Sequence, residues 1–169
     1  MGNKQRTYDG YDKSAGSSPT VTTNGLILST AIDAYKGRQL AIVDVGTAFL
    51  HADNNKETLM RLRGKIVELL VQLEPTMYRK YVTLGPNRES ILYVRLLKAL
   101  YGLLRSALLF YKKLRGDLEK MGFEVNPYNP CVANKMINGS QMTVTWHVND
   151  LKISHKESTG VKKFISPKS

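Results

Sequence analysis

Two aspartates, far apart in the chain, stand where a carboxylate could bind a metal ion. Asp44 closes the apolar run QLAIVDV at residues 39–45, and small residues follow it. Asp150 lies in the stretch TWHVNDLKI, between two runs typical of β-strands. If these strands lie side by side, both carboxylates project from one end of a sheet. Mg²⁺ prefers one or two carboxylates together with substrate phosphates, and paired metal ions drive phosphoryl or nucleotidyl transfer.

Each aspartate also has an ordinary structural explanation. Asn149-Asp150 between two strands is common hairpin chemistry, because both residue types tolerate left-handed backbone angles. An aspartate at the end of a strand, such as Asp44, commonly caps the next turn. Taken alone, the two stretches leave the turn and the metal site both open.

The charge of the chain raises the question of a polyanionic partner. There are 25 Lys and Arg against 14 Asp and Glu, a formal net charge of +11. A domain this basic usually meets phosphate on nucleic acid or a membrane surface. The basic residues are scattered, however, as they are on an ordinary soluble surface. Nucleic-acid binding and a surface that is merely soluble therefore both remain open.

The other bulk properties limit the class of protein. Cys131 is the single cysteine, which excludes an internal disulfide and a cysteine-based zinc site. This predicts a reducing, intracellular setting, the cytoplasm first and the nucleus as the alternative. No apolar stretch approaches the ~18 residues needed to span a bilayer, so no membrane partner is expected.

The periodicity of the apolar residues predicts the elements that position the two aspartates. The expected helices are Thr23 to the stop at Gly37, Lys65–Leu73, Pro75–Tyr81 and Ser106–Met121. The expected strands are Gln39–Val45, which reads as a buried strand, Thr58–Leu62, Ile91–Leu97, Cys131–Ile137, Gln141–Val148 and Leu151–Ser154. Asn138-Gly139 and Asn149-Asp150 are the predicted hairpin turns. On the helix at 65–73 the expected buried face is Ile66, Leu69, Leu70 and Leu73.

This order predicts an α+β fold, with an antiparallel sheet and helices packed on one of its faces. Residues 1–16 are polar and are expected to form a disordered leader. Residues 17–156 are expected to form one domain, and residues 157–169 a flexible tail.

Four stretches, in this order, resemble motifs of the reverse transcriptase of copia-type retrotransposons. The stretches are VDVGTAFLHAD, KALYGLLRSALLFYKKL, NPYNPCVANK and TWHVNDLKI. They resemble, respectively, the first acidic motif, the Leu-Tyr-Gly-Leu motif with its helix, the Tyr-Asp-Pro-Cys segment and the Tyr-Val-Asp-Asp-Ile hairpin. The resemblance covers roughly residues 17–155 and implies a partial palm and fingers domain with a palm-like antiparallel sheet.

The resemblance also implies roles for individual residues. Asp44, the backbone carbonyl of Val45, and Asp150 would bind Mg²⁺ or Mn²⁺. Phe49 falls where the family has the aromatic residue that blocks a ribose 2′-OH, and Gly102 would lie under the incoming nucleotide. The nucleotide-binding residues implied in this way are Val45, Phe49, Gly102 and Arg105. The implied partners are an RNA or DNA primer–template and deoxynucleoside triphosphates.

The departures from the family pattern are informative. Asn149 stands where the family has the first acid of the hairpin pair, so one of three carboxylates is replaced by a neutral amide. Arg105 lies in Leu-Arg-Ser-Ala, where the family has Lys-Gln-Ser/Ala-Pro, and the family's thumb and RNase H regions have no counterpart in this sequence. The resemblance therefore implies an impaired RNA-directed DNA polymerase. The alternative is a non-catalytic, basic nucleic-acid-binding domain derived from a retroelement.

Overall fold

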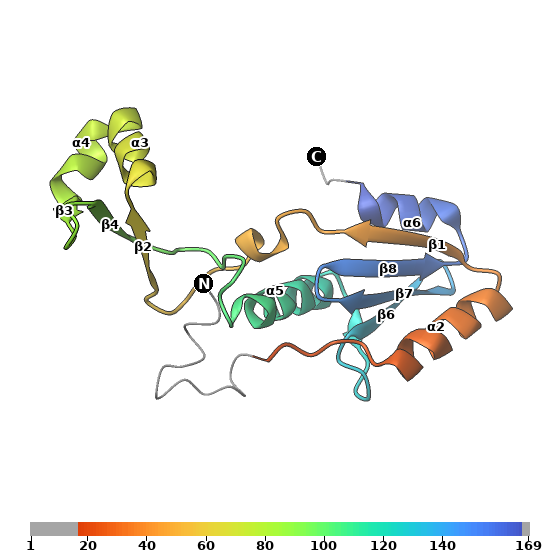
Figure 1. Ribbon diagram of the computed structural model, residues 1–169. Coiled ribbons are helices and arrows are strands. Elements are labelled where there is room, and N and C mark those ends of the chain that lie inside the picture. Colours follow the sequence, from red (N-terminus) through yellow and green to blue (C-terminus); the bar gives the residue numbers. More distant parts are fainter. Residues whose placement is uncertain (1–16, 167–169) are drawn as a thin grey trace. The chain divides into compact units, whose positions relative to one another are not determined.

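The computed structural model describes residues 17–166, so the predicted leader at residues 1–16 lies outside the described residues. The fold is α+β with antiparallel sheets, as predicted (Figure 1). The chain divides into two compact units. Residues 53–98 form the smaller unit, and the segments that end at Ala52 and begin at Ala99 form the larger one. Within the described residues, no helix is long and apolar enough to cross a membrane.

The larger unit is built on a five-stranded sheet in the order β1-β8-β7-β6-β5, in which every neighbouring pair is antiparallel. Its strands are β1 (Gln39–Asp44), β5 (Glu124–Val125), β6 (Val132–Ile137), β7 (Ser140–His147) and β8 (Asp150–His155). The first and last parts of the chain therefore meet in the β1–β8 pair. The predicted turn at Asn138-Gly139 joins β6 to β7, and both residues have positive φ.

Helices cover both faces of this sheet. Helices α5 (Ser106–Lys120) and α6 (Ser158–Ile165) pack on one face, where Leu118 and Val161 join a core around Trp146. Helix α2 (Thr23–Tyr35) lies on the opposite face, where Lys152 of β8 donates to Ser29 at 2.8 Å. The prediction of helices on one face is therefore right for α5 and wrong for α2, and α6 is a helix where a flexible tail was predicted. The polar residues of α2 that contact the sheet give no apolar signal in the sequence.

Strand β1 is not the buried strand that its apolar sequence predicts. It lies at the edge of the sheet, and the side chains of Leu40 and Ile42 are 51% and 80% exposed. Only Ala41 and Val43, on the other face, pack against the core. A short apolar run indicates a strand but does not show whether both of its faces are covered.

The tail from residue 157 is not unstructured over its described part. Ser158–Ile165 forms helix α6, Val161 is buried, and the ring of Phe164 lies 5.7 Å from that of Phe123. Val161 and Phe164 are three residues apart, so one helical turn presents both to the core. The polar residues around them conceal this pair in the sequence.

The smaller unit is a three-stranded antiparallel sheet, in the order β2-β4-β3, with helices beside it (Figure 1). Its elements are β2 (Leu59–Arg63), α3 (Lys65–Leu73), α4 (Pro75–Tyr78), the 3₁₀ turn η3 (Arg79–Tyr81), β3 (Thr83–Leu84) and β4 (Ser90–Arg95). The predicted face of α3 is wrong: Val67 is buried, whereas Ile66, Leu69 and Leu73 are exposed. Apolar residues surround α3 on several sides, so periodicity does not select the covered one.

A buried carboxylate holds α2 on the sheet of the larger unit. Asp33 is 1% exposed, and its Oδ2 lies 2.6 Å from Nζ of Lys152 while its Oδ1 lies 3.3 Å from Nη1 of Arg38. Arg38 also donates to the Thr143 hydroxyl at 3.1 Å. One acid of α2 therefore compensates two nearly buried cations, one on β8 and one on the segment that leads into β1.

We expect Asp33→Ala to lower the free energy of unfolding by about 3–5 kcal/mol, because it leaves the two cations without a counter-charge. Urea denaturation measures this loss. The control is Asp117→Ala, which removes an exposed ion pair with Lys113 on α5 and should cost no more than about 0.5 kcal/mol. Losses of equal size in the two variants would contradict the role given to Asp33.

Candidate active site

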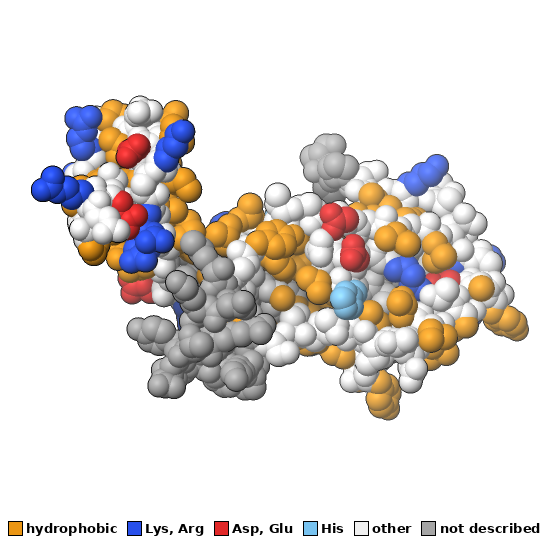
Figure 2. Space-filling view, in the orientation of Figure 1, with side chains coloured by type: hydrophobic (Ala, Val, Ile, Leu, Met, Phe, Trp, Pro, Cys, Tyr) orange, Lys and Arg blue, Asp and Glu red, His pale blue; other side chains and the backbone are white. Residues whose placement is uncertain are grey.

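Asp44 and Asp150 lie directly opposite each other. They are partners in the antiparallel β1–β8 register, at the end of the larger sheet, and both are exposed. Opposite residues in an antiparallel pair share a face, with Cβ atoms about 4.5–5.5 Å apart. Asp150 is also the partner of His147 across β7–β8. Figure 2 shows acidic side chains beside a histidine on this surface. The register thus places both predicted ligands, Asp44 and Asp150, on one sheet edge, which we call the acidic edge.

The hairpin turn between β7 and β8 differs by one residue from the predicted one. Its two loop residues are Val148 and Asn149, and Asp150 is already paired within β8. Val148 has φ 56°, a left-handed angle that is rare for a β-branched residue and that favours glycine at this turn position. Asn and Asp are the usual turn residues, so the pattern points to 149–150 although the strand pairing selects 148–149.

Asn149 is tied to the end of β1 by two hydrogen bonds. Its side-chain Nδ2 donates to Oδ1 of Asp44, and its backbone carbonyl accepts from the N–H of Val45 at 3.0 Å. The sequence identifies Asn149 as a lost carboxylate but does not predict this contact. In the structure Asn149 acts as a hydrogen-bond donor to the carboxylate of Asp44.

Two residues implied by the family resemblance lie on the segment after β1. The carbonyl of Val45 accepts from the N–H of Ala48 at 3.2 Å. Phe49 is 9% exposed, in the short helix η2 (Ala48–His51), with its ring centroid 4.4 Å from that of Tyr101 and 6.3 Å from that of Phe110. Phe49 therefore has a packing role in a small aromatic cluster, and its predicted contact with a ribose stays a prediction.

Tyr101 is a candidate site residue that is not among those predicted from the sequence. The residue is 60% exposed and its ring contacts that of Phe49, so it offers an aromatic surface to solvent. The sequence signal for Tyr101 is its place in the Leu-Tyr-Gly-Leu motif, immediately before Gly102. Gly102 has φ 90°, so the backbone itself explains the glycine.

Arg105 lies at the N-cap of α5. Its Nε is buried and has no hydrogen-bond partner among the described residues. The loop before it is closed by Ser106, whose hydroxyl donates to the carbonyl of Leu100 at 2.6 Å. The role in nucleotide binding that the resemblance implies for Arg105 stays a prediction.

The segment NPYNPC has a structural role in its own loop. Asn126 Oδ1 accepts from the N–H groups of Tyr128 and Asn129, and Asn129 Oδ1 accepts from that of Cys131. Burial raises the pKa of the Cys131 thiol to about 11, so this thiol is protonated at neutral pH and is not a nucleophile.

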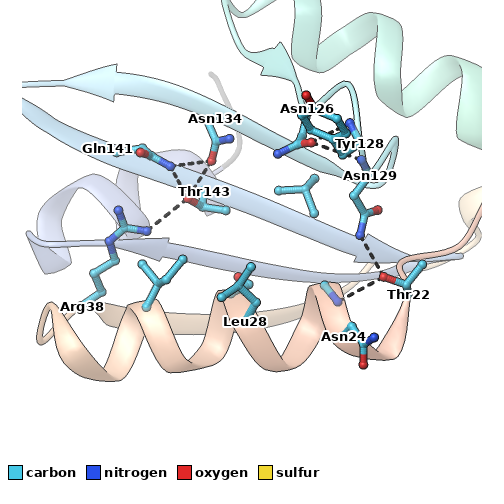
Figure 3. A pocket seen from close by; sticks show the side chains of 14 residues that line it. Thr22, Asn24, Leu28, Arg38, Asn126, Tyr128, Asn129, Asn134, Gln141 and Thr143 are labelled. Carbon is cyan, nitrogen blue, oxygen red and sulfur yellow. Dashed lines mark hydrogen bonds between the residues drawn. The ribbon is translucent and has the colours of Figure 1, made fainter.

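The same loop lines a cavity of about 450 Å³ between α2 and the sheet (Figure 3). Its wall contains a network in which Gln141 and Thr143 both donate to Oδ1 of Asn134. Neither Asp44 nor Asp150 lines this cavity, so it is separate from the acidic edge.

Comparison with known protein families identifies the chain. The model of the family described as reverse transcriptase (RNA-dependent DNA polymerase) matches residues 1–167. The chain belongs to the reverse transcriptase family. No match is found among curated proteins or among solved structures.

Reverse transcriptases use divalent metal ions, which gives the acidic edge a chemical test. Within residues 17–166, no group of three or more His, Cys, Asp and Glu side chains is arranged to hold a metal. Two opposed carboxylates nevertheless suit one Mg²⁺, which usually takes one or two carboxylates and completes its shell with water and phosphate oxygens. The two carboxylates fit one ion better than two.

The left-handed angle of Val148 gives a prediction about stability. Val148→Gly and Val148→Ala remove nearly the same packing, but only glycine adopts positive φ freely. We expect the glycine variant to be more stable than the alanine variant by about 1 kcal/mol in urea denaturation. At Val43, inside β1, the alanine variant should instead be more stable than the glycine variant. If alanine equals or exceeds glycine at position 148, the turn is not strained as described.

Proposed function

We propose that the larger unit is the nucleotidyl-transfer part of a copia-type reverse transcriptase, which acts on an RNA or DNA primer–template with deoxynucleoside triphosphates. The observation that carries the proposal is the β1–β8 register, which makes Asp44 and Asp150 direct neighbours. Membership of the reverse transcriptase family supports the reaction class. The finer assignment to copia-type elements rests on the order of the four sequence motifs.

In this proposal Asp44 and Asp150 hold one Mg²⁺ or Mn²⁺. A divalent ion at such a site polarises phosphate oxygens and neutralises developing charge. Arg105, a partly buried guanidinium at the N-cap of α5, contributes a donor to the nucleotide phosphates. Asn149 contributes no negative charge, so a second ion would be held weakly and transfer would be slow.

We expect this chain to extend a primer on an RNA template slowly in Mg²⁺, and Asn149→Asp to raise the rate. The increase should be on the order of 10²-fold, the size typical of one electrostatic group at a reacting centre. Extension is followed on a labelled primer at saturating nucleotide.

Two further variants make the primer-extension experiment decisive. Asp44→Asn should abolish extension both in the unmodified chain and in the Asn149→Asp variant. Asp117→Asn, on the exposed surface of α5, should leave extension unchanged. A rate that Asn149→Asp fails to raise would contradict the role given to residue 149.

The second candidate function, non-catalytic binding of single-stranded nucleic acid, is favoured by one surface of the smaller unit. On β2, the exposed residues Leu59, Arg61 and Arg63 alternate with inward-facing ones. Across the β2–β4 register, Leu59 faces Arg95 and Arg61 faces Tyr93. We call this set of side chains on β2 and β4 the open face, because α3 packs with the buried side of the same sheet.

The open face combines two features that suit a single strand. Tyr93 is 54% exposed, and a tyrosine ring can stack on a base. Arg61 and Arg95 are exposed and make no ion pair within the described residues, unlike Arg63, which lies 3.4 Å from Glu89. Free guanidinium groups beside an aromatic ring can bind backbone phosphates and displace counterions.

We expect Tyr93→Leu to weaken binding of a single-stranded RNA by about tenfold, within the range of one lost base stack. The combined change Arg61→Gln and Arg95→Gln should reduce the slope of log affinity against log salt by about 1.4, about 0.7 for each phosphate contact on a single strand. Fluorescence anisotropy at several salt concentrations measures both effects.

The control for the open face is Tyr128→Leu, since Tyr128 is 96% exposed on the larger unit. An affinity that does not change with salt would exclude this second function. Equal losses in Tyr93→Leu and Tyr128→Leu would place the binding elsewhere.

A further inference from the structure

We propose that Asn149 stabilises the acidic edge of this chain in the absence of metal, because its amide N–H donates to Asp44 where a cation would otherwise bind. The inference rests on the proposed cation site at Asp44 and Asp150. It goes beyond that site in assigning a positive role to the residue that departs from the family pattern.

The first step concerns the repulsion within the acidic pair. Asp44 and Asp150 are opposed on the same face of the sheet, and like charges directly opposite each other are destabilising. The pair closes the end of the β1–β8 ladder, so its repulsion opposes the pairing that joins the two strands. A favourable contact that offsets this repulsion would stabilise the end of the β1–β8 pair when no ion is bound.

The second step concerns the cations of the protein. Lys152 is two residues from Asp150 on the same face, but its Nζ lies 2.6 Å from Asp33 Oδ2 and 2.8 Å from the Ser29 hydroxyl. In the described part of the chain, neither Asp44 nor Asp150 forms an ion pair with Lys, Arg or His. Among residues 17–166, no side-chain cation pairs with either carboxylate.

The third step is the geometry of Asn149. Its Nδ2 donates to Asp44, and the carbonyl of the same residue accepts from Val45, so side chain and backbone both bind the end of β1. A hydrogen bond to a carboxylate stabilises more than one between neutral groups. An aspartate at position 149 would replace this donor by a third negative charge beside the other two.

The chain should therefore differ from a three-carboxylate site in its response to divalent cations. A cation that binds Asp44 must displace the amide of Asn149, which lowers its net gain. A third carboxylate at position 149 would bind the cation more tightly, and without the cation it would destabilise the edge. Metal dependence of stability is thus the quantity that separates the two arrangements.

The test is thermal unfolding of the full chain with EDTA and with increasing Mg²⁺ or Mn²⁺ at constant ionic strength. Without nucleotide, whose phosphates complete the shell of the ion, we expect the melting temperature of the unmodified chain to be nearly the same in EDTA and in metal. Asn149→Asp should melt about 2–4 °C lower in EDTA and recover with metal, as a change of about 1 kcal/mol produces in a chain of this size. Asn149→Ala should also melt lower in EDTA.

Two outcomes would overturn the inference. One is a melting temperature of the unmodified chain that rises with metal as much as that of Asn149→Asp. The other is an Asn149→Ala variant that matches the unmodified chain in EDTA. Because stability and not turnover is measured, failure of primer extension leaves this test intact, and a polymerase that works can still fail it.

A second measurement covers the case in which Asn149→Asp does not fold. The side-chain amide of Asn149 is observed by NMR in the unmodified chain and assigned with Asn149→Ser. One of its two protons should be shifted downfield by the carboxylate, and Asp44→Asn should remove that shift. Millimolar Mg²⁺ without nucleotide should leave the signal in place, because no phosphate is present to complete the shell of the ion. An amide signal identical in the unmodified and Asp44→Asn chains would refute the contact.

Discussion

The pairing of β1 with β8 is the constraint on which the larger unit depends. It joins Gln39–Asp44 to Asp150–His155, so it closes a loop that contains the whole smaller unit. A slip of one residue would turn every side chain of β1 to the opposite face. Ala41 and Val43 would leave the core, and Asp44 would lose its position opposite Asp150. Core packing and the acidic edge therefore impose the same register.

Two polar contacts on one face of the sheet support that register. Asp33 binds Lys152 of β8 and Arg38 just before β1, which ties α2 to both strands. At the other end of the strands, Asn149 binds Asp44 and Val45. Because Lys152 is committed to Asp33, it does not neutralise Asp150. The contact that stabilises the fold thus directs Lys152, the cation nearest in sequence to Asp150 within β8, away from the acidic edge.

The sequence predicts the local elements well because their signals are local. The apolar run at 39–45, the helix at Lys65–Leu73 and the Asn138-Gly139 turn each depend on residues close together in the chain. Predictions that depend on what covers an element fail more often. Three features do not follow from a pattern of residue types. They are the exposed face of β1, the place of α2 on the face of the sheet opposite α5, and the helix around Val161. These features are decided by contacts between distant segments.

The same distinction applies to the acidic edge. Residue types point to Asp44 and Asp150, and the register brings them together. The contribution of Asn149 could not be read from its type, because an amide can serve as donor or acceptor and its partner lies on another strand. The left-handed angle of Val148 and the two bonds of Asn149 belong to one arrangement. The side-chain amide and the backbone carbonyl of Asn149 both bond to the end of β1, so the turn is anchored directly after Val148. The neutral residue thus shapes the turn that presents Asp150, and it cannot be treated only as a missing charge.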